Sequence, residues 1–245
     1  MQRTNVWNKL DLHWLKVVAM AVLVLVAATD SLAQKRRWVE KNNPNYDERK
    51  LTYGFLIGIH TSTYQINYSD AFVTPDMDRI HSVTPKWKYG FSIGFITNYR
   101  INDQLDFRIT PKVAFYEHEL KYAYLDGTQD KIKLVETTVV ELPVLLKYKS
   151  ERRGNVRMYM IGGIKPGVEA SGQKEAKSAT VRVKTSNLSL EAGFGFDLYY
   201  PLFKFSPEIR FSHGLVNMLA NKTNEFGAPL DRVNTNTISI YFLFQ

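Results

Sequence analysis

The stretch Trp87 to Phe115 (WKYGFSIGFITNYRINDQLDFRITPKVAF) alternates between apolar and polar or small residues. Its first half is apolar at every second position: Trp87, Tyr89, Phe91, Ile93 and Phe95. After a short turn the same alternation resumes and runs to Phe115. Alternation with period two places successive side chains on opposite faces of an extended strand. The stretch therefore predicts a two-faced β-hairpin, and the question it raises is which medium each face meets.

The same alternation recurs along the chain and predicts eight strands, at 51–66, 86–101, 104–116, 132–148, 156–170, 186–200, 203–213 and 236–244. Long polar segments and short turns connect these strands in alternation. Long loops at one end and short turns at the other are typical of outer membrane β-barrels, whose short turns face the periplasm. An even number of strands brings the start of the first and the end of the last to the same side. No amphipathic helix and no internal repeat interrupts this pattern.

Charged residues decide which face looks inward. Nearly all strand charges share a face with the strand glycines, and six of them are predicted lumen residues: Arg108, Lys112, Glu141, Glu191, Glu208 and Arg210. One Arg or Lys in contact with lipid at the bilayer midplane costs about 2–4 kcal/mol. The charged face must therefore line the interior, and the aromatic face must contact lipid. A soluble barrel with an apolar interior is the alternative, but glycines on its solvent face would only weaken the strands.

The predicted fold class is all-β, an eight-stranded antiparallel transmembrane β-barrel with up-and-down meander topology and both termini periplasmic. Aromatic girdles are expected at the strand ends, formed by Trp87, Tyr99, Tyr148, Tyr199 and Tyr200. Four prolines fall inside predicted strands, namely Pro111, Pro143, Pro166 and Pro207. Because proline cannot donate to a β-ladder, we expect bulges at these positions or positions outside the bilayer.

The N-terminal part predicts export. Basic residues precede the apolar run 17–28, and Ser31 to Ala33 fits a signal cleavage site. The run is shorter than the roughly 20 residues that span a bilayer as a helix. We therefore expect a signal peptide at 1–33, a periplasmic N-terminal segment at 34–50 and the barrel domain at 51–245. The chain has no cysteine, which excludes disulfides, thiolate metal sites and a lipid-modified N-terminal cysteine.

No residue pattern predicts a catalytic site, a metal site or a cofactor. The histidines beyond the predicted signal peptide lack the spacing of a metal site. The stretch RFSHGLVN (Arg210 to Asn217) resembles the His-x-Ser-Asn stretch of lipid A deacylases. Leu215 stands at the nucleophile position, however, and Ser212 would point to the opposite face from His213.

The chain has a formal net charge of +8, but its basic residues are spread through the predicted lumen, loops and tail. This distribution argues against binding of nucleic acid. A local basic excess lies in segment 34–50, where Arg36, Arg37, Trp38 and Lys41 are candidate docking residues for an acidic periplasmic partner. Tyr46 would be a second aromatic anchor. Ordinary solvated charge without a partner is the alternative interpretation.

Four blocks of sequence resemble the PorT family of outer membrane barrels: NNPNYDERKLTYGFLIGIH (42–60), GFSIGFITNYRINDQLDFRITPKVAF (90–115), VVELPVLLKYKSERRGNVRMYMIGG (139–163) and EIRFSHGLVNML (208–219). The resemblance implies a non-enzymatic role in type IX protein secretion. It implies as partners outer membrane lipid, lipopolysaccharide and other secretion-system proteins, with no nucleic acid and no small-molecule substrate. Because side chains fill an eight-stranded lumen, we expect an assembly or accessory component and not the translocon. The alternatives are a small-solute channel, a structural outer membrane protein or, more remotely, a lipid A-modifying enzyme.

Overall fold

The computed structural model of this chain describes residues 41–69, 80–124, 131–170, 185–219 and 228–245. All of these residues belong to one unit, Lys41–Gln245. The predicted signal peptide and the first part of the N-terminal segment lie outside the described residues. No helix among the described residues is long and apolar enough to span a membrane.

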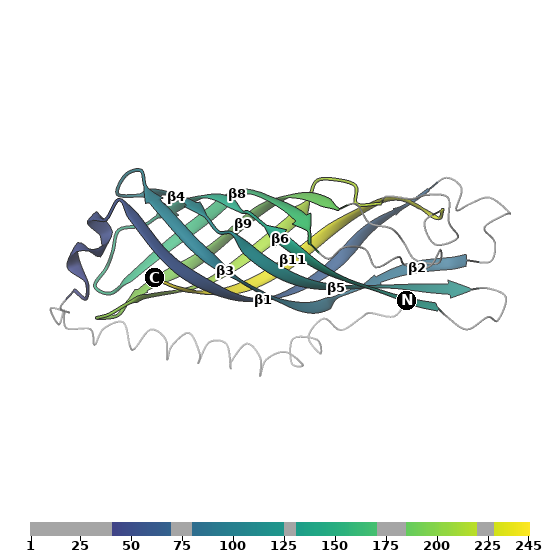
Figure 1. The fold of residues 1–245 in the computed structure, drawn as a ribbon, viewed down its shortest axis with the longest axis horizontal. Helices are drawn as coiled ribbons and strands as arrows, with labels where there is room; N and C mark the ends of the chain where they lie inside the picture. Colours follow the sequence, from purple (N-terminus) through teal and green to yellow (C-terminus); the bar gives the residue numbers. More distant parts are fainter. Residues whose placement is uncertain (1–40, 70–79, 125–130, 171–184, 220–227) are drawn as a thin grey trace, which may run out of the picture. The chain divides into compact units, whose positions relative to one another are not determined.

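The described residues form one short 3₁₀-helix and eleven antiparallel strands (Figure 1). The elements are η1 (Pro44–Glu48), β1 (Leu51–Tyr68), β2 (Ile80–Lys86), β3 (Lys88–Arg100), β4 (Leu105–Ile109), β5 (Lys112–Tyr124), β6 (Lys131–Glu141), β7 (Val144–Lys149), β8 (Val156–Glu169), β9 (Ser186–Tyr199), β10 (Lys204–Gly214) and β11 (Leu230–Phe244). Strand β1 pairs with β3 on one side and with β11 on the other, which closes the sheet into a ring.

The ring has eight strands because three of them are interrupted. The interruptions separate β2 from β3, β4 from β5 and β6 from β7. The two halves of each strand lie end to end and share a neighbour: β2 and β3 both pair with β5, β4 and β5 with β3, and β6 and β7 with β8. The predicted eight-stranded barrel is confirmed, whereas the continuous strands predicted at 104–116 and 132–148 are wrong. Pro111 lies in the interruption between β4 and β5, and Pro143 lies in the one between β6 and β7. Proline has no N–H group to donate to a neighbouring strand, so the ladder breaks there.

The neighbouring strands still bond across these interruptions. The Phe95 N–H donates to Pro111 O at 2.9 Å, and the Thr110 N–H donates to Pro143 O at 3.0 Å. The other two prolines, Pro166 and Pro207, remain inside β8 and β10. The ring is therefore continuous although two of its strands break at nearly the same level.

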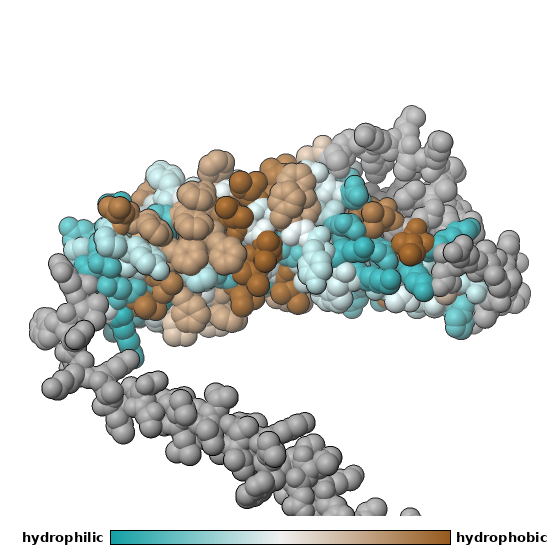
Figure 2. Space-filling view, turned by 90° about the horizontal axis from the view of Figure 1, so that it is seen from below, coloured by the Kyte–Doolittle hydropathy of each residue, from teal (hydrophilic) through white to brown (hydrophobic). Residues whose placement is uncertain are grey.

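The outer surface of the barrel is apolar. Figure 2 shows hydrophobic side chains gathered over the middle of the visible face, with more hydrophilic ones toward both ends. Phe95, at 69% exposed, is typical of the outward-pointing aromatic residues. Four of the predicted girdle residues are exposed, namely Trp87, Tyr99, Tyr148 and Tyr200. Tyr199 is 3% exposed, so its assignment to a girdle was wrong, because adjacent residues of a strand point to opposite faces.

We name the two ends of the barrel by their connections. The short-turn end carries residues 101–104, 150–155 and 200–203, and the loop end is the opposite one. Several strands run further toward the loop end than predicted: β1 to Tyr68, β5 to Tyr124 and β11 from Leu230. Part of the sequence expected to be polar loop is therefore strand.

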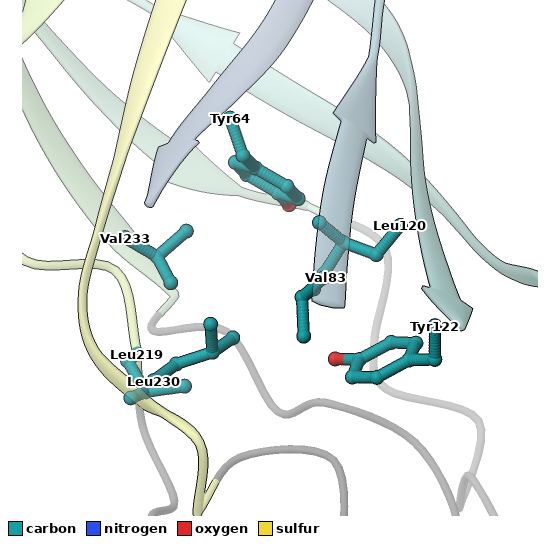
Figure 3. Close-up of a cluster of buried hydrophobic side chains, with 7 residues drawn as sticks. All are labelled: Tyr64, Val83, Leu120, Tyr122, Leu219, Leu230 and Val233. Carbon is teal, nitrogen blue, oxygen red and sulfur yellow. The ribbon is translucent and has the colours of Figure 1, made fainter. Parts of the chain in front are cut away.

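An apolar cluster packs inside these strand extensions (Figure 3), consisting of Tyr64, Val83, Leu120, Tyr122, Leu219, Leu230 and Val233. Val83 enters the cluster because of a bulge. Phe91 and Lys86 are five positions apart in the sequence, but their partners Phe115 and Glu119 are only four positions apart. The extra residue reverses the alternation beyond Trp87, which turns Val83 inward. The interior of the loop end is thus apolar, whereas elsewhere in the lumen smaller apolar clusters, such as Leu56, Ile96 and Leu243, lie beside charged side chains.

Candidate functional site

The centre of the lumen is an ion-pair network around Glu208 of β10. Its Oε2 accepts hydrogen bonds from Arg108 Nη1 at 2.7 Å and from the Tyr159 hydroxyl at 2.6 Å. Arg210 donates through Nε to the other carboxylate oxygen of Glu208 and through Nη1 to Glu191 Oε1, the latter at 2.8 Å. The charged groups of this network are almost fully buried and come from β4, β9 and β10. Side chains from across the barrel therefore meet on its axis.

A second network adjoins the first and is centred on Glu141 of β6. Lys112 Nζ lies 3.2 Å from Glu141 Oε2, and Lys165 Nζ lies 3.1 Å from Oε1. The Tyr116 hydroxyl also donates to Oε1 at 2.8 Å. The Lys112 ammonium group sits 4.4 Å from the ring centroid of Tyr241. The six predicted lumen residues thus lie in two neighbouring networks inside the barrel.

Sequence reasoning missed the lumen tyrosines. Tyr116 and Tyr159 share the face of Lys112 and Arg157 in the period-two pattern, so the signal was present in the sequence. Glycine makes room for one of these rings. A Cβ atom at Gly195 would lie 2.6 Å from the Tyr159 hydroxyl oxygen, too close for any side chain. The lumen therefore alternates glycines with large polar side chains, as a narrow barrel requires.

At the short-turn end, η1 lies across the mouth of the barrel. Asp47 accepts hydrogen bonds from the Tyr199 hydroxyl at 2.7 Å and from Arg157 Nη1 at 3.0 Å. Arg152 Nη1 is 3.4 Å from the same carboxylate. The side-chain amides of Asn42 and Asn43 donate to the carbonyl oxygens of Tyr199 and Tyr200 at 3.0 and 2.8 Å. We call residues Asn42–Glu48 the closing segment.

Tyr46 of the closing segment points into the barrel. Its ring meets Tyr199 edge-on at 6.0 Å, and Lys204 Nζ lies 4.6 Å from its centroid. Burial raises the pKa of the Tyr46 phenol to about 12. The expectation that Tyr46 anchors a partner protein was wrong, because its own barrel buries it. Lys41 is exposed, whereas the candidate docking residues Arg36, Arg37 and Trp38 lie outside the described residues.

The lumen therefore holds little space between its two ends. The apolar cluster fills the loop end, and the closing segment covers the short-turn end. Two cavities inside the barrel have volumes of about 40 and 20 Å³. Because one water needs about 10–15 Å³ of such volume, these cavities are the size of a few waters at most. A larger hollow of about 600 Å³ lies outside the lumen, between the closing segment and the turns at 102–104 and 150–152.

Ser212 and His213, the residues that the sequence favours most for catalysis, do not form a catalytic pair. Ser212 is buried on the lumen face of β10, and the next residue, His213, points the other way. His213 Nδ1 is 2.6 Å from Asn236 Oδ1. Among the described residues, no group of acidic, histidine or cysteine side chains could hold a metal ion. The arrangement at His213 does not form a nucleophile–base pair.

A closed eight-stranded barrel with an aromatic exterior and a lumen crossed by ion pairs is a transmembrane barrel of the outer membrane type. Residues 32–220 match the family described as outer membrane protein beta-barrel domain. The chain belongs to this family. The protein is integral to the outer membrane, and its exterior contacts outer membrane lipid.

Solved structures of similar proteins include three outer membrane barrels. OprG from Pseudomonas aeruginosa is 12% identical with a TM-score of 0.45, and the match covers 78% of this chain and 93% of OprG. Neisserial surface protein A is 12% identical with a TM-score of 0.39, covering 80% and 98%. Ail, the attachment invasion locus protein of Yersinia pestis, is 15% identical with a TM-score of 0.34, covering 78% and 96%. No curated protein matches the chain.

Proposed function

We propose that this barrel is a non-enzymatic assembly or accessory component of type IX protein secretion that acts through its surfaces. The filled lumen is the observation that supports a role through the surfaces of the barrel and not through its interior. Arg108, Glu208 and Arg210 meet on the barrel axis, and the closing segment covers one mouth. Neither a folded nor an extended polypeptide fits through such a lumen. The resemblance of four sequence blocks to the PorT family supports the assignment to type IX secretion.

The periplasmic side is the proposed working surface. Short turns of outer membrane barrels face the periplasm, and this rule orients the closing segment toward the periplasm as well. Asn42 and Asn43 tie the segment to the carbonyl oxygens of β9 and of the turn after it. Arg36, Arg37, Trp38 and Lys41 precede this anchored point in the sequence. We propose that they bind an acidic surface of another secretion component, because opposite charge steers and orients such contacts.

A deletion strain tests the assignment to type IX secretion. Secreted substrates should be retained in the cell without this protein and released again when the unaltered chain is restored. Normal secretion from the deletion strain would overturn this role and leave a structural outer membrane protein as the better interpretation.

Complementation with altered chains tests the docking residues separately. The triple change Arg36→Glu, Arg37→Glu, Lys41→Glu should keep normal barrel abundance, since no strand residue changes, and should abolish rescue and partner co-purification. The matched control, Arg36→Lys, Arg37→Lys, Lys41→Arg, keeps each charge and should rescue. Equal rescue by both triple variants would refute the docking role and would leave the proposed role in secretion standing.

A further inference from the structure

A small chamber lies inside the barrel beneath the closing segment. Its volume is about 20 Å³, and Tyr46 and Asp47 form part of its wall. Five basic but only three acidic side chains line it. We call this cavity the inner chamber. Two of the basic side chains do not count toward a buried excess, because Arg49 is exposed and Arg100 pairs with Asp103. The buried cations at this place are Lys147, Lys149, Arg157 and Lys204, and they outnumber the three carboxylates by one.

Each carboxylate of the chamber already has a close cationic partner. Asp47 pairs with Arg157 at 3.0 Å, and Asp106 pairs with Lys149 at 2.6 Å. The third, Asp197, receives a hydrogen bond from Lys147 Nζ at 2.6 Å, where Lys147 is itself fully buried. Each acidic group of the chamber is therefore already paired with a cation.

Lys204 is left without a carboxylate of its own. It is 5% exposed, and its Nζ lies 4.0 Å from Asp197 Oδ1, which already accepts a hydrogen bond from Ser206 at 2.6 Å. Within the described part of the chain, the Lys204 ammonium group makes no side-chain hydrogen bond. The Tyr46 ring face offsets part of its charge, but an ammonium group out of water also requires acceptors.

Arg157 supplies a second, independent sign of a missing acceptor. The residue is buried and lines the inner chamber, and its Nε has no hydrogen-bond partner although its Nη1 binds Asp47. Buried donors of this kind in native structures call for an explanation such as a water or an ion. Two cationic donors, one on β8 and one on β10, thus border the same small space.

We propose that the inner chamber binds one monatomic inorganic anion of about the size of chloride, on Lys204 and Arg157 beneath Tyr46. The volume admits a single water-sized occupant, which excludes phosphate, sulfate and organic acids. The positive excess excludes a cation. A water could satisfy the hydrogen bonds but would leave the Lys204 charge to a single carboxylate, Asp197, which is 4.0 Å away and shared with Lys147.

The site has a consequence for the closing segment. Tyr46 lines the chamber and lies over Lys204, so a bound anion would also contact the closing segment. The bound anion should therefore stabilise the closed mouth. This inference is independent of the role in secretion, because it rests only on the interior of the barrel.

Crystals of the intact barrel soaked in bromide test the site directly, since bromide replaces chloride and scatters anomalously. An anomalous peak within hydrogen-bond distance of Lys204 Nζ and Arg157 Nε is the expected result. Ordinary water density at that place in bromide-soaked crystals, with no anomalous signal, would overturn the proposal.

Thermal unfolding in detergent provides the second measurement, at equal ionic strength in sodium chloride and in sodium gluconate, whose anion is too large to enter. At about five times its dissociation constant, chloride should raise Tm by about 2–4 °C. Lys204→Gln should remove the difference, and Lys50→Gln, which neutralises an exposed lysine at the same end, should keep it. A difference that persists in Lys204→Gln, or is missing in the unaltered chain, contradicts the site. If Lys204→Gln does not fold, the bromide result decides.

Discussion

At the scale of single residues, the interior of this barrel is stabilised by charges that neutralise one another. Glu208 shows why this requires several partners. Its two carboxylate oxygens face Arg108, Arg210 and the Tyr159 hydroxyl, so few of its lone pairs are left unsatisfied. The attraction within a buried ion pair barely offsets the cost of removing both charges from water. Removing one member, however, leaves the other charge buried without a partner. The lumen charges should therefore tolerate single deletions poorly.

Replacing Glu208 by alanine tests this expectation. The change leaves Arg108 without its carboxylate and leaves Arg210 with Glu191 alone. We expect a loss of about 3–5 kcal/mol in the free energy of unfolding, measured by urea denaturation of the barrel in detergent micelles. The control Glu151→Ala removes an exposed carboxylate from a turn and should change stability by less than about 0.5 kcal/mol. Equal effects of the two changes would mean that water, and not Glu208, compensates the lumen arginines.

At the scale of elements, the strands and their faces could be predicted from alternation, but the interruptions could not. The period-two pattern is local, and it located all eight strands and the lumen face of Arg108 and Lys112. The bulge at Trp87 depends on how β2 and β3 both pair with β5, which no local pattern reveals. For the same reason Val83 was assigned to a polar loop, although it packs in the apolar cluster.

In the closing segment, sequence reasoning gave Tyr46 the wrong partner. The segment's basic and aromatic residues suggested contact with another protein, yet Tyr46 and Asp47 contact Tyr199 of β9, about 150 positions later in the sequence. Contacts of such sequence separation leave no periodic signal. The segment's position therefore became visible only in the folded barrel.

The charge of Asp47 should hold the closing segment in place. Asp47→Ala removes its contacts with Arg152, Arg157 and Tyr199. Trypsin should then cleave faster after Arg49, which is exposed directly beyond η1, while the barrel itself stays resistant. The matched control is Glu48→Ala, which removes the neighbouring exposed carboxylate and should leave the cleavage rate unchanged. The same rate in both variants would show that the Asp47 contacts do not hold the segment.

At the scale of the whole molecule, the barrel combines two kinds of interior. Ion pairs cross the part of the lumen that the lipid-facing aromatic residues surround. Apolar side chains fill the space inside the strand extensions at the loop end. The six charged lumen residues were predictable because the cost of charge in lipid leaves them no other face. The tyrosines that donate hydrogen bonds to the lumen carboxylates, and the closure of both ends, follow from packing across the barrel and from the bulge.

The assignment of inside and outside predicts how the barrel inserts into membranes. Phe95→Arg places a charge on the lipid face opposite Phe55, at a cost of about 2–4 kcal/mol near the midplane. The folded fraction in liposomes, read from the heat-dependent shift in gel migration, should fall. Phe95→Leu keeps an apolar side chain and should insert nearly as well as the unaltered protein. Normal insertion of the arginine variant would reverse the assignment of the two faces.

The central claim is that this barrel has a closed lumen and acts through its surfaces. Ion current through the purified barrel in a planar lipid bilayer tests it most directly, because the Glu208 and Glu141 networks and the closing segment all obstruct the same path. We predict no steady conductance above that of the bare bilayer. A stable, reproducible current that scales with the number of inserted barrels would contradict a closed lumen and favour a small-solute channel.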